Sequence, residues 1–204
     1  MTATPYSDNI NDYLKCDNII DFHNEAISEL AEKLYKQATD ETDFIRLAYE
    51  YVRDNIPHSA DINADTVPCS ASEVLKDGHG ICFAQSHLLA AILRAKDIPC
   101  GFCYQKLILD DETAPILVYH GLNGVYVNQY KKWIRLDTRG DAEFSIETEK
   151  LAYTVRTEKG EQDCFTVYPA PDKNVIAKMT INRTRTQMYE NPPTELAYTK
   201  TAPL

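Results

Sequence analysis

No stretch of apolar residues in this sequence approaches the roughly 20 that a helix needs to cross a bilayer. The N-terminal segment, residues 1–12, is polar and acidic and lacks the apolar core of a signal peptide. We therefore expect no membrane partner and a cytoplasmic protein.

The sequence also lacks any run of basic residues. Lys and Arg number 21 against 31 Asp and Glu, which gives a formal net charge of −10, and the cations are scattered along the chain. Because an acidic surface repels a phosphate backbone, we expect no nucleic-acid partner. The acidity is interpreted as a feature that serves solubility.

Cysteine is too sparse and too irregularly spaced for a disulfide scaffold in a chain of 204 residues. We expect most of the six thiols to be reduced and buried: Cys16, Cys69, Cys82, Cys100, Cys103 and Cys164. The chain also has no internal repeat and no linker. With 44% hydrophobic and 25% charged residues, it has the composition of one folded domain spanning residues 1–204.

The chain does contain a helical half followed by a strand-rich half, which predicts an α+β fold. Apolar periodicity and end signals predict helices near residues 27–38, 44–52, 70–77 and 82–96. Residues rich in Tyr, Val, Ile and Leu predict antiparallel strands at 101–109, 116–127, 133–137, 152–156 and 164–168. From Asn182 onward the periodicity is weak.

Cys82 is the candidate nucleophile. It follows the glycine-flanked turn Gly78-His79-Gly80 and stands in the first turn of the most regular predicted helix. Unpaired N–H groups at a helix start stabilise a thiolate and lower its pKa. The same groups can form part of an oxyanion hole if they point toward the developing charge. None of the other five cysteines occupies such a position.

His120 and Asp137 lie on consecutive predicted strands. A two-residue turn at Asn128-Gln129 would pair Val127 with Tyr130 and set His120 directly opposite Asp137. The carboxylate would then orient the imidazole as a base. A longer turn would slip the register, and a slip by an odd number would separate the two side chains onto opposite faces.

Together these residues resemble the transglutaminase-like superfamily. The resemblance rests on Gly80-Ile81-Cys82-Phe83-Ala84, on the strand histidine, and on Trp133-Ile134-Arg135-Leu136-Asp137. It implies a papain-like α+β fold in which the nucleophile helix packs on an antiparallel sheet. The core would span about 44–140, with an N-terminal helical extension at 1–40 and a C-terminal β-rich extension and tail at 141–204.

The resemblance also implies a Cys82-His120-Asp137 triad that attacks peptide or glutamine-type amides through a thioester. Phe83 stands where cross-linking members typically carry Trp, which favours the bacterial peptidase-like branch over protein cross-linking. No metal or cofactor is expected. Four further residues are candidates for binding substrate or the oxyanion: Gly80, Ile81, His58 and His79.

Three alternatives remain open at this point. Cys100 and Cys103 have the C-x-x-C spacing of redox pairs, but they follow Pro99 at a strand start, where their sulfurs would point to opposite faces. The same two cysteines with a nearby His could bind zinc, although no second ligand pair completes the site. The third alternative is a non-catalytic binding module. The presence of all three triad residue types disfavours this alternative.

Overall fold

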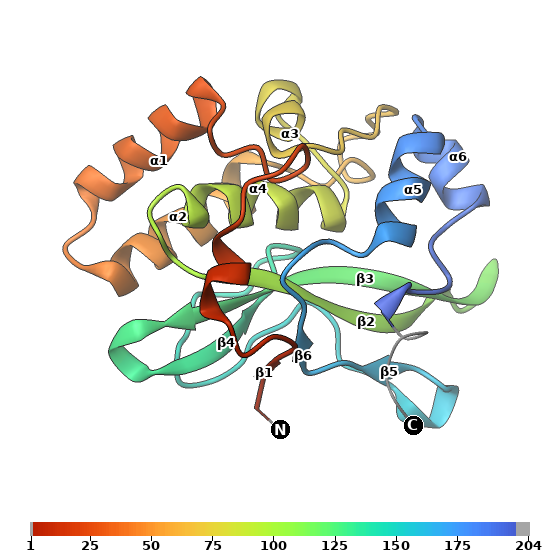
Figure 1. The fold of residues 1–204 in the computed structure, drawn as a ribbon. Helices are drawn as coiled ribbons and strands as arrows, with labels where there is room; N and C mark the ends of the chain where they lie inside the picture. The colour runs from red at the N-terminus through yellow and green to blue at the C-terminus, as the bar shows by residue number, and fades with distance from the viewer. Residues whose placement is uncertain (1, 199–204) are drawn as a thin grey trace.

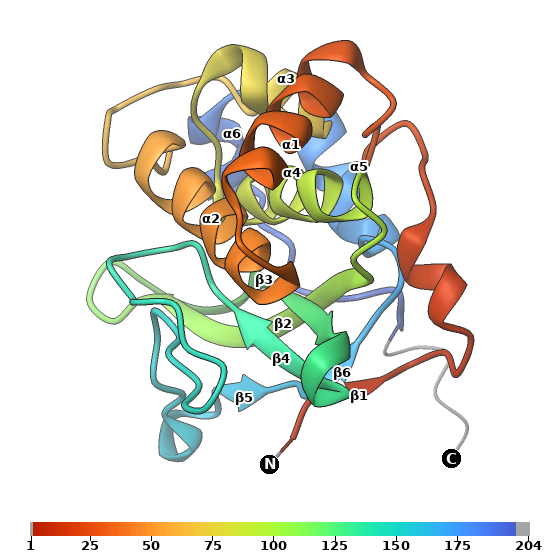
Figure 2. The same ribbon diagram turned by 90° about the vertical axis from the view of Figure 1, so that its left-hand side faces the viewer.

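In the computed structural model, residues 2–198 are described. Figures 1 and 2 show the α-helices gathered on one side of a central sheet. Four helices precede the sheet: α1 (Glu25–Gln37), α2 (Glu41–Asn55), α3 (Ala71–Asp77) and α4 (Cys82–Arg94). The sheet has the order β4-β3-β2-β5, with strands β2 (Cys100–Asp110), β3 (Ala114–Val127), β4 (Lys132–Leu136) and β5 (Gln162–Asp163).

Side-chain caps set the ends of the helices. Asp40 accepts a hydrogen bond from Asp43 N at the start of α2, and Ser70 and Glu73 form the predicted capping box of α3. Gly78 ends α3 in the left-handed conformation, with φ of 70°, which glycine adopts without steric cost. The chain therefore turns sharply between α3 and α4.

Strands β2 and β3 form a long antiparallel hairpin whose outer edge is only partly covered. β4 pairs with β3 only from Asn123 to Val127. Beyond that point the edge of β3 is free of β4, and the Tyr119 N–H instead donates to the Pro193 carbonyl at 3.0 Å. The uncovered stretch includes His120.

The prediction of strands after β4 is wrong in part. Residues 152–156 form no strand, and 164–168 contain only the short β6 (Thr166–Val167), which pairs in parallel with β1 (Thr4–Pro5). The expected β-rich extension instead carries two helices, α5 (Lys173–Ile181) and α6 (Arg185–Glu190). In the predicted helical extension, α1 is preceded by β1 and a 3-10 helix at Ile10–Leu14.

The main hydrophobic core lies between the helices and the sheet, and α4 is its centre. Every residue of α4 from Phe83 to Arg94 is buried. A smaller cluster on the other face of the sheet joins Tyr13, Leu122, Trp133 and Val167. No helix within residues 2–198 has the length and apolar character that a bilayer crossing requires.

Candidate functional site

Glycines bring the first turn of α4 against the sheet. A Cβ on Gly121 of β3 would lie 2.5 Å from Phe83 Cδ1, and one on Gly80 would lie 2.7 Å from Ala84 Cβ. Such distances are shorter than real side chains adopt, so both positions need glycine for this approach. Cys82, the first residue of α4, is thereby held half-buried beside the free edge of β3.

His120 and Asp137 meet, and the turn between their strands is the longer of the two alternatives considered. The connection from Asn128 to Lys131 is four residues long and pairs Val127 with Lys132. The register is therefore shifted by two residues from the one that a two-residue turn would give. An even shift keeps both side chains on the same face of the sheet, and His120 Nε2 lies 2.9 Å from Asp137 Oδ2.

The segment after β4 holds the Asp137 carboxylate through backbone donors. Arg139 N donates to Oδ1 and Ala152 N to Oδ2, each at 3.0 Å. The Tyr49 hydroxyl of α2 lies 3.0 Å from the Asp137 carbonyl oxygen. Asp137 is therefore fixed by both the loop and a neighbouring helix.

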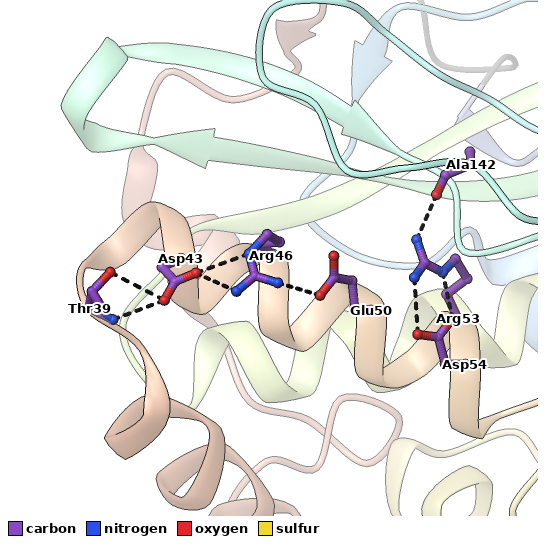
Figure 3. Close-up of polar contacts among 7 residues, drawn as sticks. All are labelled: Thr39, Asp43, Arg46, Glu50, Arg53, Asp54 and Ala142. Carbon is purple, nitrogen blue, oxygen red and sulfur yellow. Dashed lines mark hydrogen bonds and ion pairs between the residues drawn. The ribbon is translucent and has the colours of Figure 1, made fainter.

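Helix α2 also anchors the segment that follows Asp137. Figure 3 shows the polar side chains along this helix, with Arg53 reaching the carbonyl oxygen of Ala142 at 2.9 Å. At the other end, Arg46 bridges Asp43 and Glu50 at 2.6 and 2.5 Å. The Tyr49 hydroxyl lies 2.8 Å from the same Ala142 oxygen. Helix α2 thus holds the loop that leaves the site.

The charges of the three side chains favour a thiolate–imidazolium pair. Burial works to raise the pKa of Cys82, but the charges and hydrogen bonds of His120, and then of His58, lower this pKa to about 6. Burial opposes protonation of His120, yet Asp137 and Cys82 hold its pKa well above the usual value. Despite its burial, Asp137 has a lowered pKa because of His120 and the two backbone donors.

His58, which sequence position alone suggested, lies at the same cavity as Cys82 and His120. Its backbone runs beside Gly80: Ser59 N donates to the Gly80 carbonyl at 3.0 Å, and Gly80 N donates to the Pro57 carbonyl at 3.2 Å. The Ala60 N–H donates to His58 Nδ1 at 3.2 Å. In the neutral ring, the proton is therefore assigned to Nε2.

The other three candidate binding residues have different surroundings. His79 is 8% exposed, with Nδ1 3.0 Å from Ser59 Oγ and Nε2 3.2 Å from Thr66 Oγ1. It holds the loop of His58 rather than lining the cavity. Ile81 is the N-cap of α4 and makes no side-chain cap hydrogen bond. Its side chain therefore does not pair with any of the first N–H groups of the helix. Gly80 lies beside His58.

Tyr153 is a residue of the site that sequence reasoning missed. Its ring meets the His120 ring edge-on, with centroids 5.0 Å apart and planes at 83°. The next residue back, Ala152, is the one that donates to Asp137. Tyr153, in the segment that follows β4, thus covers one side of the imidazole ring. No sequence signal indicated this, because residues 152–156 had the pattern of a strand.

A cavity of about 360 Å³ joins these groups. It lies between the outer part of the β2–β3 hairpin and the loop around Tyr153. Its lining includes Cys82, His120, His58, Leu107, Leu109, Val118, Arg139, Tyr153, Arg156 and Glu161. The thiol and the imidazole therefore face space in which a small part of a substrate fits.

The rival cysteine pair is built into the core. Cys100 and Cys103 are fully buried and belong to hydrophobic clusters on opposite faces of the sheet. Burial raises the pKa of Cys100 to about 12 and that of Cys103 well above its usual value. This geometry contradicts a reactive C-x-x-C pair. Within residues 2–198, no group of three or more His, Cys, Asp or Glu side chains is arranged to hold a metal ion.

Comparisons with known proteins agree with this architecture. A model of the transglutaminase-like superfamily matches residues 28–138. No curated protein matches the chain. Among solved structures, a proposed cysteine protease from Cytophaga hutchinsonii is similar, with a TM-score of 0.52 at 17% identity over 65% of this chain and 42% of that one. The predicted family resemblance and the α+β, papain-like fold are confirmed.

Two further solved structures are more distantly similar. One is a proposed protease from Parabacteroides distasonis, with a TM-score of 0.42 at 16% identity over 63% of this chain and 25% of that one. The other is a TGase, with a TM-score of 0.41 at 18% identity over 78% and 46%. The chain spans less than half the length of each of these three structures.

Proposed function

Because the chain belongs to the transglutaminase-like superfamily, we propose that it is a cysteine-dependent hydrolase or acyl transferase acting on peptide or glutamine-type amides. One observation carries the proposal: Cys82, His120 and His58 converge on one cavity, with His120 held 2.9 Å from Asp137. This is the arrangement that nucleophilic catalysis by a thiol requires.

The proposed reaction begins with attack of the Cys82 thiolate on the amide carbonyl carbon. The carbonyl π electrons move to oxygen, and the oxyanion lies toward the backbone N–H groups at the start of α4 and the Nε2–H of His58. His120 then gives its proton to the amide nitrogen as the carbon–nitrogen bond breaks. The amine leaves, and a thioester remains on Cys82.

In the second half, an acceptor resolves the thioester. Neutral His120 takes a proton from water as the water oxygen bonds to the carbonyl carbon, and the carbon–sulfur bond breaks. The acid is released and the thiolate–imidazolium pair is restored. We propose water rather than an amine as the main acceptor, because Phe83 replaces the Trp typical of cross-linking members. Asp137 keeps the imidazole oriented throughout.

The first test is the rate of Cys82 alkylation against pH, followed by mass spectrometry in the wild type and in His120→Ala. We expect the wild-type rate to rise with a midpoint near the pKa of about 6, below the thiol reference of about 8.5. In His120→Ala, the midpoint should move to higher pH, because the larger of the two histidine interactions that lower the Cys82 pKa is lost. An unchanged midpoint in the variant, or a wild-type midpoint near the reference, contradicts the ion pair.

The second test is hydrolysis of peptide amides and glutamine-containing peptides by the wild type and by Cys82→Ala. We expect removal of the nucleophile to lower kcat/KM by about a thousandfold or more. Cys164→Ala is the matched control, since Cys164 is also a half-buried free thiol and does not line the cavity. Hydrolysis that survives in Cys82→Ala would contradict the proposed chemistry.

A further inference from the structure

The floor of the cavity beside His120 is apolar. In the β2–β3 ladder, Leu107 pairs with Val118, two residues from the pair formed by Gln105 and His120. Because side chains alternate along a strand, Leu107 and Val118 lie on the same face as His120. Leu109 follows on that face, one further step of about 7 Å away from the catalytic histidine.

Two of these side chains, Leu107 and Val118, are buried by the protein but lie apart from its two hydrophobic clusters. Leu107 and Val118 are each 8% exposed, yet neither belongs to the two hydrophobic clusters of residues 2–198. Both line the cavity, together with Leu109. The part of their apolar surface that the protein leaves uncovered therefore faces the space beside the thiol.

The charged groups that line the same cavity are already paired. Arg139 donates to both carboxylate oxygens of Asp61 at 2.6 and 2.9 Å. Arg156 bonds Glu161 at 2.5 Å and Asp111 at 2.5 Å. Glu161 Oε1 also accepts from the Ile108 N–H at 3.1 Å. A charged substrate side chain would lose its hydration here, and it would find no unpaired group of opposite charge in the cavity lining to replace it.

We infer that this cavity binds a large apolar side chain, of the leucine or phenylalanine class, that flanks the scissile amide. The inference rests on the proposed function and narrows it, because it makes apolar peptides better ligands than glutamine-containing ones. An apolar side chain removes both its own surface and that of Leu107, Leu109 and Val118 from water. A glutamine side chain of similar length would have to leave its amide partly unpaired against this floor.

The test is an NMR titration of the Cys82→Ala variant, which cannot turn substrate over by the proposed route. Its ligands are acetyl-Ala-Leu-Ala-amide and acetyl-Ala-Gln-Ala-amide. We expect the leucyl peptide to bind at least about tenfold more tightly, the scale of small apolar differences in a pocket. It should also shift the methyl signals of Leu107 and Val118.

Two further substitutions in that variant each replace a β-branched apolar side chain with threonine. Val118→Thr puts a hydroxyl into the floor at nearly constant volume, and we expect it to reduce the preference for leucine to about threefold or less. Ile116→Thr is the matched control on the same strand, because Ile116 is 44% exposed and does not line the cavity. We expect Ile116→Thr to leave the preference unchanged.

Equal affinity for the two peptides, tighter binding of the glutamine peptide, or no saturable binding of the leucyl peptide would overturn the inference. Methyl shifts confined to residues away from the cavity would do the same. The proposed function is judged separately by hydrolysis that depends on Cys82. The binding preference is read in a protein without that thiol, so either proposal can fail while the other stands.

Discussion

At the scale of single residues, two histidines stabilise the same thiolate from different sides. His120 is itself held by Asp137, whereas His58 is placed by its backbone contacts to Gly80 and by the Ala60 N–H. The interaction of His120 with Cys82 is the stronger of the two. The two imidazoles should therefore contribute unequally to the reactivity of Cys82.

We expect the kcat/KM for amide hydrolysis to follow a bell-shaped pH profile in the wild type. Activity should be lost below the Cys82 pKa of about 6, where the thiol is protonated. It should be lost again above the raised pKa of His120, where the imidazolium no longer protonates the leaving amine.

His58→Ala should move the acidic limb of this profile upward, but by less than His120→Ala moves the alkylation midpoint. His23→Ala, an exposed histidine before α1, is the control and should leave the limb in place. A shift as large in His58→Ala as in His120→Ala would contradict the ranking. No shift in His58→Ala would remove that residue from the site.

At the scale of elements, the site depends on how closely α4 approaches the hairpin. Gly121, next to His120, leaves the space that the Phe83 ring occupies. Because Phe83 directly follows Cys82 in α4, a displacement of the Phe83 backbone would also move the thiol. The approach of helix to strand therefore sets the distance between nucleophile and base.

Gly121→Ala should destabilise the protein by about 1–3 kcal/mol, the usual cost of overpacking a filled core. Denaturant unfolding measures the change, and Cys82 alkylation at pH 7 should slow in the same variant. In the matched double variant Gly121→Ala/Phe83→Leu, the smaller Leu side chain leaves room for the added methyl group. Its free energy of unfolding should therefore exceed the value predicted by adding the effects of the two single substitutions. Strict additivity would show that the two positions do not meet.

At the scale of the whole molecule, the C-terminal segment completes the surroundings of the site. Pro193 accepts from the Tyr119 N–H one residue before His120, and Leu196 is 1% exposed within the main core. Further along, the Tyr198 ring stacks on that of Tyr168 at 4.1 Å. Residues at the end of the described chain therefore stabilise the hairpin that carries the base.

Leu196→Ala should lower the free energy of unfolding by about 2–4 kcal/mol, because it leaves a cavity in the core. Ile181→Ala is the control: Ile181 is 70% exposed at the end of α5, and its loss should change stability by less than about 0.5 kcal/mol. Thermal and denaturant unfolding measure both. Similar effects of the two substitutions would show that the segment is not packed as described.

The sequence by itself determined the parts of this protein that depend on local pattern. Periodicity and caps predicted the helices that contain Cys82 and the Ser70–Glu73 capping box, and runs rich in Tyr, Val, Ile and Leu predicted β2, β3 and β4. The motifs around Cys82, His120 and Asp137 together pointed to the family. Such features could be predicted because they depend on residues only a few positions apart, and the sequence gives that spacing directly.

Only the tertiary structure decided the register of β3 and β4, the role of the segment with Tyr153, and the helices α5 and α6. The turn at Asn128 could have been of several lengths, and it was the even shift that kept His120 with Asp137. His58 and Tyr153 reach the site through backbone contacts with distant segments. Contacts of that kind depend on how separate elements pack, which the local pattern of a single sequence does not specify.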